Sequence, residues 1–480
     1  MRTFILSALL ILPSFAQQQS DFYEHEIIPL PEGQIMEISS IALMPDDKVA
    51  VATRRGDLWI CSGAYGDDLS KVTWEKFAHG LHEPIGMYYR DGSFFLTQRP
   101  ELSRIEDMDG DGIADMFETI NSDWGINGDY HEYAFGTDPD KNGDVWVTLC
   151  LTGSFNAKSD WRGWALRITP DGKMVPTCSG IRSPGGIGFN AEGDVFYTDN
   201  QGTWNGSSSL KWLKPGSFQG SPVGNKYHKL ADLPAPPEPE SGSRILAERL
   251  KHPSFIPPAV IIPHARMGQS PTGIEPDLSG GKFGPWEDQV YIGEQTHSQV
   301  QRVFLEKVNG LYQGAVFHFL EGFEAGLIPV KLDQEKGVMF AGGSNRGWAS
   351  RGTKPFTFER VKWNGKIPFE IRTMEAEPDG FTLTFTAAVD PKTAGDPSSY
   401  IMEAWTYIYQ SDYGSPEVDK ATPTIQKAEV SEDNKSVRLT IDGLVRGHLH
   451  HLKADAVKSA GGDFLWHKEA FYTLNEIPSE

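Results

Sequence analysis

Short apolar strands separated by glycine-containing turns recur along the first three quarters of the chain. The segments Glu83 to Thr97 and Ser183 to Thr198 repeat one pattern: Pro-x-Gly, a short apolar strand, a turn with Asp-Gly or Glu-Gly, and a second strand that ends in Thr. This pattern predicts a β-hairpin. Related copies begin near Ile41, Phe135, Ile274 and Ile328.

The spacing of these hairpins predicts the architecture of the main body. Six copies, mostly roughly 45 to 55 residues apart, suit the four-stranded blades of a β-propeller, which hide their faces by closing into a ring. We therefore expect an all-β protein with a six-bladed β-propeller over residues 17–365. The longer gap between the fourth and fifth copies holds a proline-rich stretch, residues 233–243, which we interpret as a surface insertion.

The pattern changes after residue 365. Apolar and polar residues alternate at Phe381 to Phe385 and again at Ser436 to Ile441, which is typical of half-buried strands. The segment 366–480 therefore predicts a strand-only module of about 110 residues, the size of an immunoglobulin-like β-sandwich.

The first sixteen residues predict a signal peptide. Arg2 precedes an apolar run from Phe4 to Leu12, and small residues lead to Ala16, after which we expect cleavage. The run is shorter than the about 20 residues that cross a bilayer. We therefore expect a secreted or periplasmic protein that does not span a membrane.

Charge and cysteine content exclude some functions. With 44 Lys and Arg against 65 Asp and Glu, the formal net charge is −21, which argues against nucleic acid as a partner. The chain lacks the C-x-x-C-H sequence that attaches haem covalently, so no haem of this type is expected. Three cysteines allow one disulfide and leave one thiol over: Cys61, Cys150 and Cys178.

The repeats also indicate where chemistry is located. In a propeller, the loop before each innermost strand and the loop after the second strand open on one face. The first kind of position holds Glu37, His82, Glu83, His131, Arg182 and Gln269; the second holds Arg54, Arg55, Gln98, Arg99, Asp199, Asn200, Gln295, His297, Asn345 and Arg346. Such a rim could grip an anionic planar group through arginines while a histidine removes a proton.

A separate motif predicts a calcium loop. Oxygen ligands at positions 1, 3, 5, 9 and 12, a glycine at position 6 and a carbonyl at position 7 match the spacing by which a loop wraps Ca²⁺. The ligands would be Asp107, Asp109, Asp111, Ile113 (through its carbonyl), Asp115 and Glu118. Because a strand pattern precedes it, we expect a structural calcium loop between strands.

Residues 36–365 resemble the glucose/sorbosone dehydrogenase-type quinoproteins, six-bladed propellers that bind pyrroloquinoline quinone (PQQ) and oxidise sugars. The chain also looks like a branch of large secreted bacterial propeller proteins described as membrane-bound dehydrogenases or haem-binding proteins, whose longer members carry a C-x-x-C-H segment. The segments that carry this closer resemblance are Asp107 to Asp115, Asp199 to Gly202, Lys214 to Phe218 and Arg266 to Pro271.

The resemblance implies an exported sugar or alcohol dehydrogenase that passes hydride to a PQQ-type cofactor and electrons to an external acceptor. His131 would be the base and Arg182 the catalytic quinone clamp. Further cofactor contacts would be His297, Asn345, Arg346 and Gln269. The chain departs from the family where Glu132, Tyr133 and Ala134 follow the histidine in place of a glycine pair, and where Ser183 follows the arginine.

Two other functions suit the same rim. One is a non-catalytic propeller that binds a carbohydrate or a protein. The other is a calcium-dependent hydrolase of the lactonase type, with a metal in the channel held by carboxylates such as Glu37, Glu83 and Asp199.

Overall fold

The structure is a computed structural model that describes residues 17–479, and strands dominate it. The predicted signal peptide, residues 1–16, lies outside the described residues. Helices are short: η1 (Gln19–Asp21), η2 (Leu69–Lys71), η3 (Pro222–Ala231), α1 (Ile245–Lys251), α2 (Pro391–Ala394) and η4 (Pro397–Ser399). Between residues 17 and 479, no helix combines the length and apolar character needed to cross a membrane.

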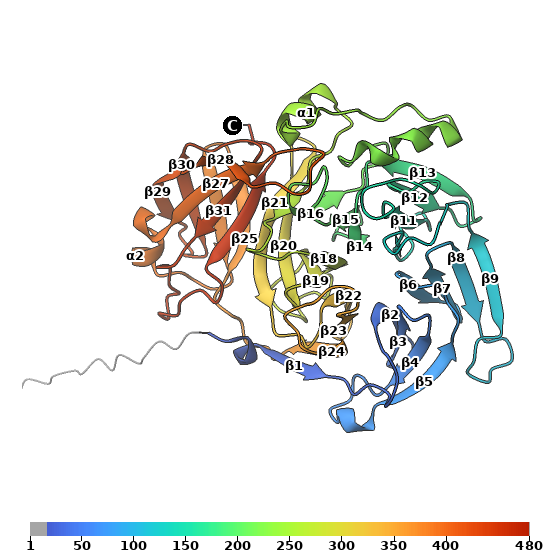
Figure 1. The fold of residues 1–480 in the computed structure, drawn as a ribbon. Coiled ribbons are helices and arrows are strands. Elements are labelled where there is room, and N and C mark those ends of the chain that lie inside the picture. The colour runs from blue at the N-terminus through green and yellow to red at the C-terminus, as the bar shows by residue number, and fades with distance from the viewer. Residues whose placement is uncertain (1–16, 480) are drawn as a thin grey trace, which may run out of the picture.

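Three four-stranded antiparallel sheets follow one another in the first part of the chain, and we name them blades 1 to 3 (Figure 1). Blade 1 contains β2 (Ile38–Met44), β3 (Lys48–Thr53), β4 (Leu58–Ser62) and β5 (Thr73–Ala78). Blade 2 contains β6 (Met87–Arg90), β7 (Ser93–Thr97), β8 (Leu102–Glu106) and β9 (Met116–Asn121). Blade 3 contains β10 (Ala134–Gly136), β11 (Val145–Leu149), β12 (Trp164–Ile168) and β13 (Met174–Ser179).

Three more blades complete the ring. Blade 4 contains β14 (Pro184–Phe189), β15 (Val195–Asp199), β16 (Ser208–Trp212) and β17 (Val260–Ile262). Blade 5 contains β18 (Pro271–Pro276), β19 (Val290–Glu294), β20 (Gln299–Val308) and β21 (Leu311–Leu320). Blade 6 contains β22 (Leu327–Asp333), β23 (Val338–Ser344), β24 (Phe356–Trp363) and, as its outermost strand, the N-terminal β1 (Tyr23–Ile27).

The predicted hairpins are confirmed, because the first two strands of every blade pair antiparallel at the repeated pattern. Innermost strands of neighbouring blades contact each other, as β14 does with β18 and β2 with β22. The glycine-rich β14 makes this approach feasible: a Cβ on Gly186 would overlap the carbonyl of Thr272 on β18. The sheets thus surround a central channel, the arrangement of a β-propeller (Figure 1).

The proline-rich insertion lies within blade 4, between β16 and β17. It contains η3, an irregular stretch over residues 233–243, and α1. The side chain of Asn225 donates a hydrogen bond to the carbonyl of Pro237 at 2.7 Å, which ties the stretch back to η3.

The C-terminal region forms two further four-stranded arrays. One is a separate sheet in the order β25 (Ile371–Glu377), β26 (Gly380–Phe385), β30 (Ser436–Asp442) and β29 (Thr424–Val430). The other extends blade 5 outward from β21 through β32 (Glu469–Leu474), β31 (His448–Lys453), β27 (Ile401–Tyr407) and β28 (Glu417–Ala421), which makes one eight-stranded sheet.

This continuity joins the C-terminal region to the propeller through a shared core. Trp405 of β27 and Phe471 of β32 are buried in one cluster with Val303 and Val316 of blade 5. The immunoglobulin-like assignment stays a prediction. The strand pattern on which it depended is observed, and the predicted boundary at residue 365 falls in the connection between β24 and β25.

Candidate functional site

A cavity of about 500 Å³ lies at the end of the channel where the loops before the innermost strands meet the loops after the second strands. We call it the rim cavity. Arg54 and Arg346 reach it from the ends of β3 and β23, and His131 and Arg182 reach it just before β10 and β14. Asn200 and Gln295 also line it, so the structure brings together six of the rim positions singled out from the repeats.

The rim cavity is positively charged although the chain is strongly acidic. Three arginines and one histidine line it, and no Asp or Glu of residues 17–479 is among the lining side chains. Aromatic rings form much of the remaining wall: Tyr130, Tyr133, Phe135, Trp348 and Tyr413. Such a lining favours an anionic ligand with flat faces.

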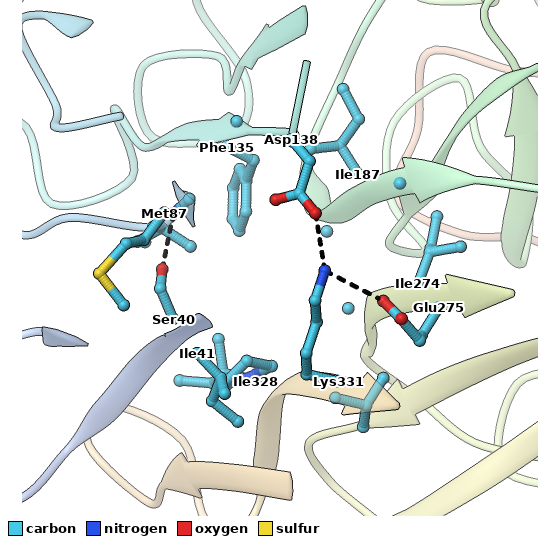
Figure 2. Close-up of a pocket in the computed structure, with 18 of the residues that line it drawn as sticks. Ser40, Ile41, Met87, Phe135, Asp138, Ile187, Ile274, Glu275, Ile328 and Lys331 are labelled. Carbon is cyan, nitrogen blue, oxygen red and sulfur yellow. Dashed lines mark hydrogen bonds and ion pairs between the residues drawn. The ribbon is translucent and has the colours of Figure 1, made fainter. Parts of the chain in front are cut away.

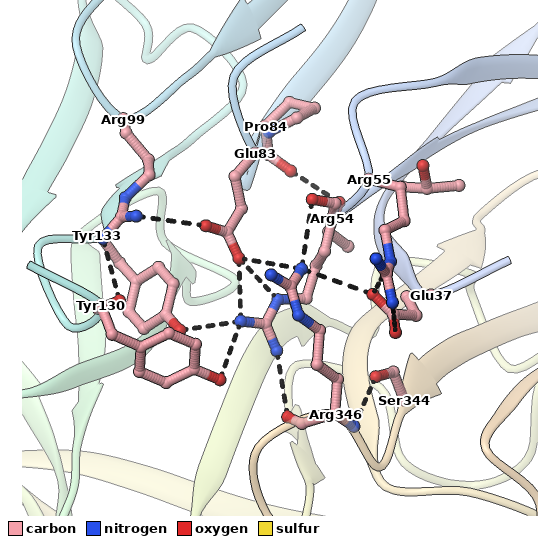
Figure 3. A network of polar contacts seen from close by, with 12 residues as sticks. Glu37, Arg54, Arg55, Glu83, Pro84, Arg99, Tyr130, Tyr133, Ser344 and Arg346 are labelled. Atoms are coloured by element: carbon pink, nitrogen blue, oxygen red, sulfur yellow. Dashed lines mark hydrogen bonds and ion pairs between the residues drawn. The ribbon is translucent and has the colours of Figure 1, made fainter. Parts of the chain in front are cut away.

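Two of the arginines belong to a buried ion network (Figure 3). Glu83 lies at its centre: its carboxylate is 2.8 Å from Arg54 Nη2, 3.4 Å from Arg99 Nη1 and 3.6 Å from Arg346 Nη1. Glu37 joins it through Arg346 Nη1 at 3.4 Å and Arg55 Nε at 3.1 Å. Four arginines thus share two carboxylates (Figure 3), and two of the four, Arg54 and Arg346, line the cavity.

Arg182 is held in a different way. Its Nη1 donates hydrogen bonds to the carbonyls of Asn200 at 3.2 Å and Gln201 at 2.8 Å, and its guanidinium lies flat against Gly202, where any Cβ would overlap it. Arg182 is only 3% exposed, its Nε has no hydrogen-bond partner, and no carboxylate in the described part of the chain pairs with it. A buried guanidinium without a counter-ion is a strong site for an anion.

His131 and Tyr130 are adjacent titratable groups on the cavity wall. Burial lowers the pKa of His131 below 6.5; Asp129, with Oδ1 3.9 Å from Nδ1, opposes this, while the charges of Arg182 and Arg99 add to it. The imidazole is therefore neutral at pH 7 and can accept a proton.

The phenol of Tyr130 is also tuned by its neighbours. Burial raises its pKa, but the contacts with Tyr133 and Arg54 and the charge of Arg346 outweigh burial and bring the pKa below 10. The hydroxyl lies 3.2 Å from Arg54 Nη2, and the rings of Tyr130 and His131 meet edge to face at 5.1 Å. Tyr130 is thus a second group beside His131 that could hold a proton.

Three of the predicted cofactor contacts do not line the rim cavity. Asn345 uses its side chain inside its own loop, donating to the carbonyls of Gly352 and Lys354 at 2.9 and 2.8 Å. Gln269 donates its backbone N–H to Glu294 at 2.8 Å, and the buried His297 is placed beside the same carboxylate. Their roles stay predictions.

The carboxylates considered for a channel metal are all engaged by cations. Glu37 and Glu83 belong to the arginine network, and Asp199 is fully buried with Lys211 Nζ at 2.9 Å. Each negative charge is thus already balanced, which leaves little affinity for a dication at these positions. This arrangement disfavours the hydrolase interpretation.

Next to the rim cavity, a second cavity of about 110 Å³ lies in the channel, and the two cavities share Ile85, Phe135 and Ile328 in their walls (Figure 2). Innermost strands of all six blades line it with apolar side chains, among them Ile41, Met87, Phe135, Ile187, Ile274 and Ile328. Three charged side chains line the same cavity: Lys331 Nζ pairs with Asp138 at 2.7 Å and Glu275 at 3.7 Å (Figure 2). The second cavity therefore combines apolar walls with an internally paired charge cluster.

The predicted calcium loop connects β8 to β9. One carboxylate oxygen from each of Asp107, Asp109 and Asp115 lies within 4.8 Å of the others, a spacing that one cation could bridge. Asp107 accepts backbone N–H groups of Gly110 and Gly112 at 2.7 and 2.8 Å, and these hydrogen bonds lower its pKa, Gly112 most strongly.

The remaining predicted calcium ligands are not part of that cluster. Asp111 accepts the backbone N–H of Ile113 at 2.9 Å, and Glu118 lies on β9 with its carboxylate 3.7 Å from Arg104. Three of the six predicted ligands thus lie within reach of one cation, and the roles of Asp111, Ile113 and Glu118 stay predictions.

Sequence reasoning missed the aromatic part of the site. Tyr130 and Tyr133 flank the predicted base His131, and Trp348 follows Arg346 by two residues, so proximity to the motifs could have indicated them. Tyr413 lies in the C-terminal region, far from any rim motif, and no local signal marked it.

Comparisons with known proteins support the fold. The profile of a domain of unknown function (DUF7133) matches residues 66–232, about a third of the chain. Curated protein sequences contain no match.

Among solved structures, a glucose dehydrogenase covers 72% of this chain and 100% of its own at 14% identity, with a TM-score of 0.51. A carbohydrate-active enzyme of family AA12 from Trichoderma reesei covers 74% and 100% at 10% identity, with a TM-score of 0.50. The PQQ-bound aldose sugar dehydrogenase of Streptomyces coelicolor covers 73% and 100% at 15% identity, with a TM-score of 0.48. At such identities the similarity is one of fold.

Proposed function

We propose that the protein is an exported quinoprotein-like sugar dehydrogenase that oxidises a sugar hydroxyl in the rim cavity. The observation that supports this most is the lining by Arg54, Arg182 and Arg346 without any carboxylate of the described residues. PQQ is a planar tricarboxylate, so its charge and shape suit arginines set among aromatic rings. When bound, PQQ supplies the quinone that accepts a hydride from the sugar carbon.

The residues of the cavity would divide the remaining work. Arg182, buried and without a counter-ion among the described residues, would bind and orient an anionic group of the cofactor. His131, whose pKa is lowered chiefly by burial, would take the proton of the sugar hydroxyl; Nε2 is the available atom because Nδ1 faces Asp129.

For the loop between β8 and β9 we propose a structural calcium ion. Asp107, Asp109 and Asp115 would hold it, with water and loop carbonyls completing the shell. This calcium site would be separate from the rim cavity, because none of the three ligands lines that cavity.

Reconstitution of the mature protein tests the dehydrogenase proposal. PQQ and calcium are added, cofactor binding is followed by absorbance, and reduction of an electron-accepting dye is measured with a panel of aldoses. His131→Ala should bind PQQ with unchanged affinity and lose at least about a hundredfold in turnover. Arg182→Gln should instead weaken PQQ binding by about tenfold or more, since a charged hydrogen bond is lost.

Two results would contradict the proposal. Absence of PQQ binding by the wild-type protein would favour a non-catalytic rim that binds carbohydrate or protein. Equal turnover by wild type and His131→Ala would remove His131 from the reaction.

A further inference from the structure

The loop that connects β27 to β28 crosses from the C-terminal region onto the rim of blade 4. Backbone hydrogen bonds hold it there: Trp204 N–H donates to Gln410 at 2.7 Å, Gly414 N–H to Gly202 at 3.0 Å, and Ser415 N–H to Gly206 at 3.1 Å. All three hydrogen bonds join main-chain groups, and Thr203 and Tyr413 form an antiparallel β-bridge, so the loop docks through main-chain pairing as an added strand would.

Side chains reinforce the docking on either side. Glu417, at the start of β28, forms a two-pronged ion pair with Arg266 at 2.8 and 2.9 Å. Asp419 pairs with Arg244 of the insertion at 2.6 and 3.1 Å. The position of the loop on the rim is therefore set by several independent contacts.

The docked loop places Tyr413 in the wall of the rim cavity. Its ring lies 5.3 Å from Cζ of Arg182 and 6.1 Å from the ring of Phe155, which is itself 5.8 Å from Cζ of Arg182. Two aromatic rings thus lie beside the buried guanidinium. The propeller alone would leave Arg182 without one of these rings.

Exposed aromatic side chains gather at the opening of the rim cavity, which we call the mouth. Tyr413 is 60% exposed and Phe155 49%, and Trp348, on the wall contributed by blade 6, is 61% exposed. The backbone carbonyl of Trp348 accepts a hydrogen bond from the Gln295 side chain at 2.8 Å, which fixes that segment. Large aromatic faces left open to water beside a polar cavity mark a ligand contact.

The rim cavity offers two kinds of contact. Its three arginines offer positive charge, whereas Tyr413, Trp348 and the neighbouring Phe155 offer flat apolar faces with polar groups between them. A pyranose ring matches the mouth, because its C–H face packs on an aromatic ring while its hydroxyls bond to the surrounding polar groups. The rim cavity, of about 500 Å³, is larger than one pyranose ring, so a saccharide with at least two rings can occupy both the aromatic side chains and the space beside His131.

We propose that Tyr413, with Phe155 and Trp348, forms a subsite for a second sugar ring, and that the C-terminal region thereby gives the protein a preference for oligosaccharides over monosaccharides. Oxidation of the first ring depends on the proposed function, whereas the subsite itself requires only that a second ring binds.

The experiment uses the full mature chain and two readouts. Binding of glucose, cellobiose and cellotriose, and of maltose and maltotriose, is measured by calorimetry without cofactor, and dye reduction is measured with PQQ. In at least one series the wild type should bind the di- and trisaccharide about tenfold more tightly than glucose, the effect of one aromatic contact of about 1.4 kcal/mol.

Substitutions then locate the preference. Tyr413→Ala should bring the affinity for the longer sugars to within about twofold of glucose, and Tyr413→Phe should retain the wild-type preference because the ring face is kept. Phe117→Ala is the matched control: this aromatic residue is 55% exposed on β9 and lines no part of the rim cavity.

The outcomes separate the two proposals. If longer sugars bind in a Tyr413-dependent manner but no dye is reduced, the dehydrogenase proposal is contradicted and the subsite is supported. Dye reduction in which the ratio of kcat/KM between glucose and the preferred disaccharide is the same in wild type and Tyr413→Ala would overturn the subsite alone. Absence of saccharide binding in both series, or no difference between mono- and oligosaccharides, also overturns it.

Discussion

Glu83→Gln should destabilise the fold because it removes the charge at the centre of the arginine network. The Glu83 side chain is 8% exposed, and its two nearest cations, Arg54 and Arg99, are 7% and 8% exposed. Removing one member of a buried ion pair costs about 3–5 kcal/mol, because the remaining charge stays buried without compensation. Glutamine keeps one hydrogen bond to Arg54, so we expect the low end, a loss of about 3 kcal/mol in the free energy of unfolding.

Urea unfolding followed by tryptophan fluorescence measures this loss. The matched control is Glu24→Gln, which breaks an exposed pair with Lys362 at 3.2 Å and should cost less than about 1 kcal/mol. Glu83→Gln should also bind anions at the rim at least as tightly as the wild type, because the network beside the cavity gains net positive charge. A loss of stability equal to that of the control would refute the view that Glu83 neutralises the network.

Three further predictions follow from other parts of the molecule. Asp107→Ala combined with Asp109→Ala should abolish the rise in melting temperature that calcium gives the wild type, and an unchanged calcium response would rule out the loop as a site. Burial, aided by Asp138, raises the pKa of Glu275 from 4.5 to about 7, so the folded protein keeps a proton that the unfolded chain loses. The stabilisation that this proton gives the folded state is full below pH 4.5 and lost as the pH rises through 7. Glu275→Gln should therefore reduce the pH dependence of the free energy of unfolding across that window, and an unchanged pH dependence would contradict the raised pKa of Glu275. Burial raises the pKa of all three thiols, so a thiol reagent should label none in the native protein and three in denaturant; labelling of a native thiol would contradict the burial of Cys61, Cys150 and Cys178.

Features that depend on neighbouring residues could be predicted from the sequence. The hairpins at Ile41 and Ile187 are local, because a turn and two alternating strands are enough to define them. The clustering of Asp107, Asp109 and Asp115 is local for the same reason: a loop of nine residues brings the carboxylates together. Ligands beyond that loop could not be judged by spacing, and Glu118 lies on a strand beside Arg104 instead.

Contacts between distant segments depended on the tertiary structure. The pairing of β1 with β24 closes blade 6, and the pairing of β32 with β21 fuses the C-terminal region to blade 5. Edge strands accept any partner of suitable shape, so their partners are not encoded in a local pattern.

The sequence by itself determined which residue types stand at the rim, since the repeats place His131 and Arg182 before innermost strands and Arg54 and Arg346 after second strands. Only the tertiary structure decided what each one does. Arg54 and Arg346 share Glu83, whereas no carboxylate of residues 17–479 pairs with Arg182, and Tyr413 reaches it from a segment more than two hundred residues away. The physical reason is that charge pairing and burial depend on distances in space, which the order of residues along a chain does not express.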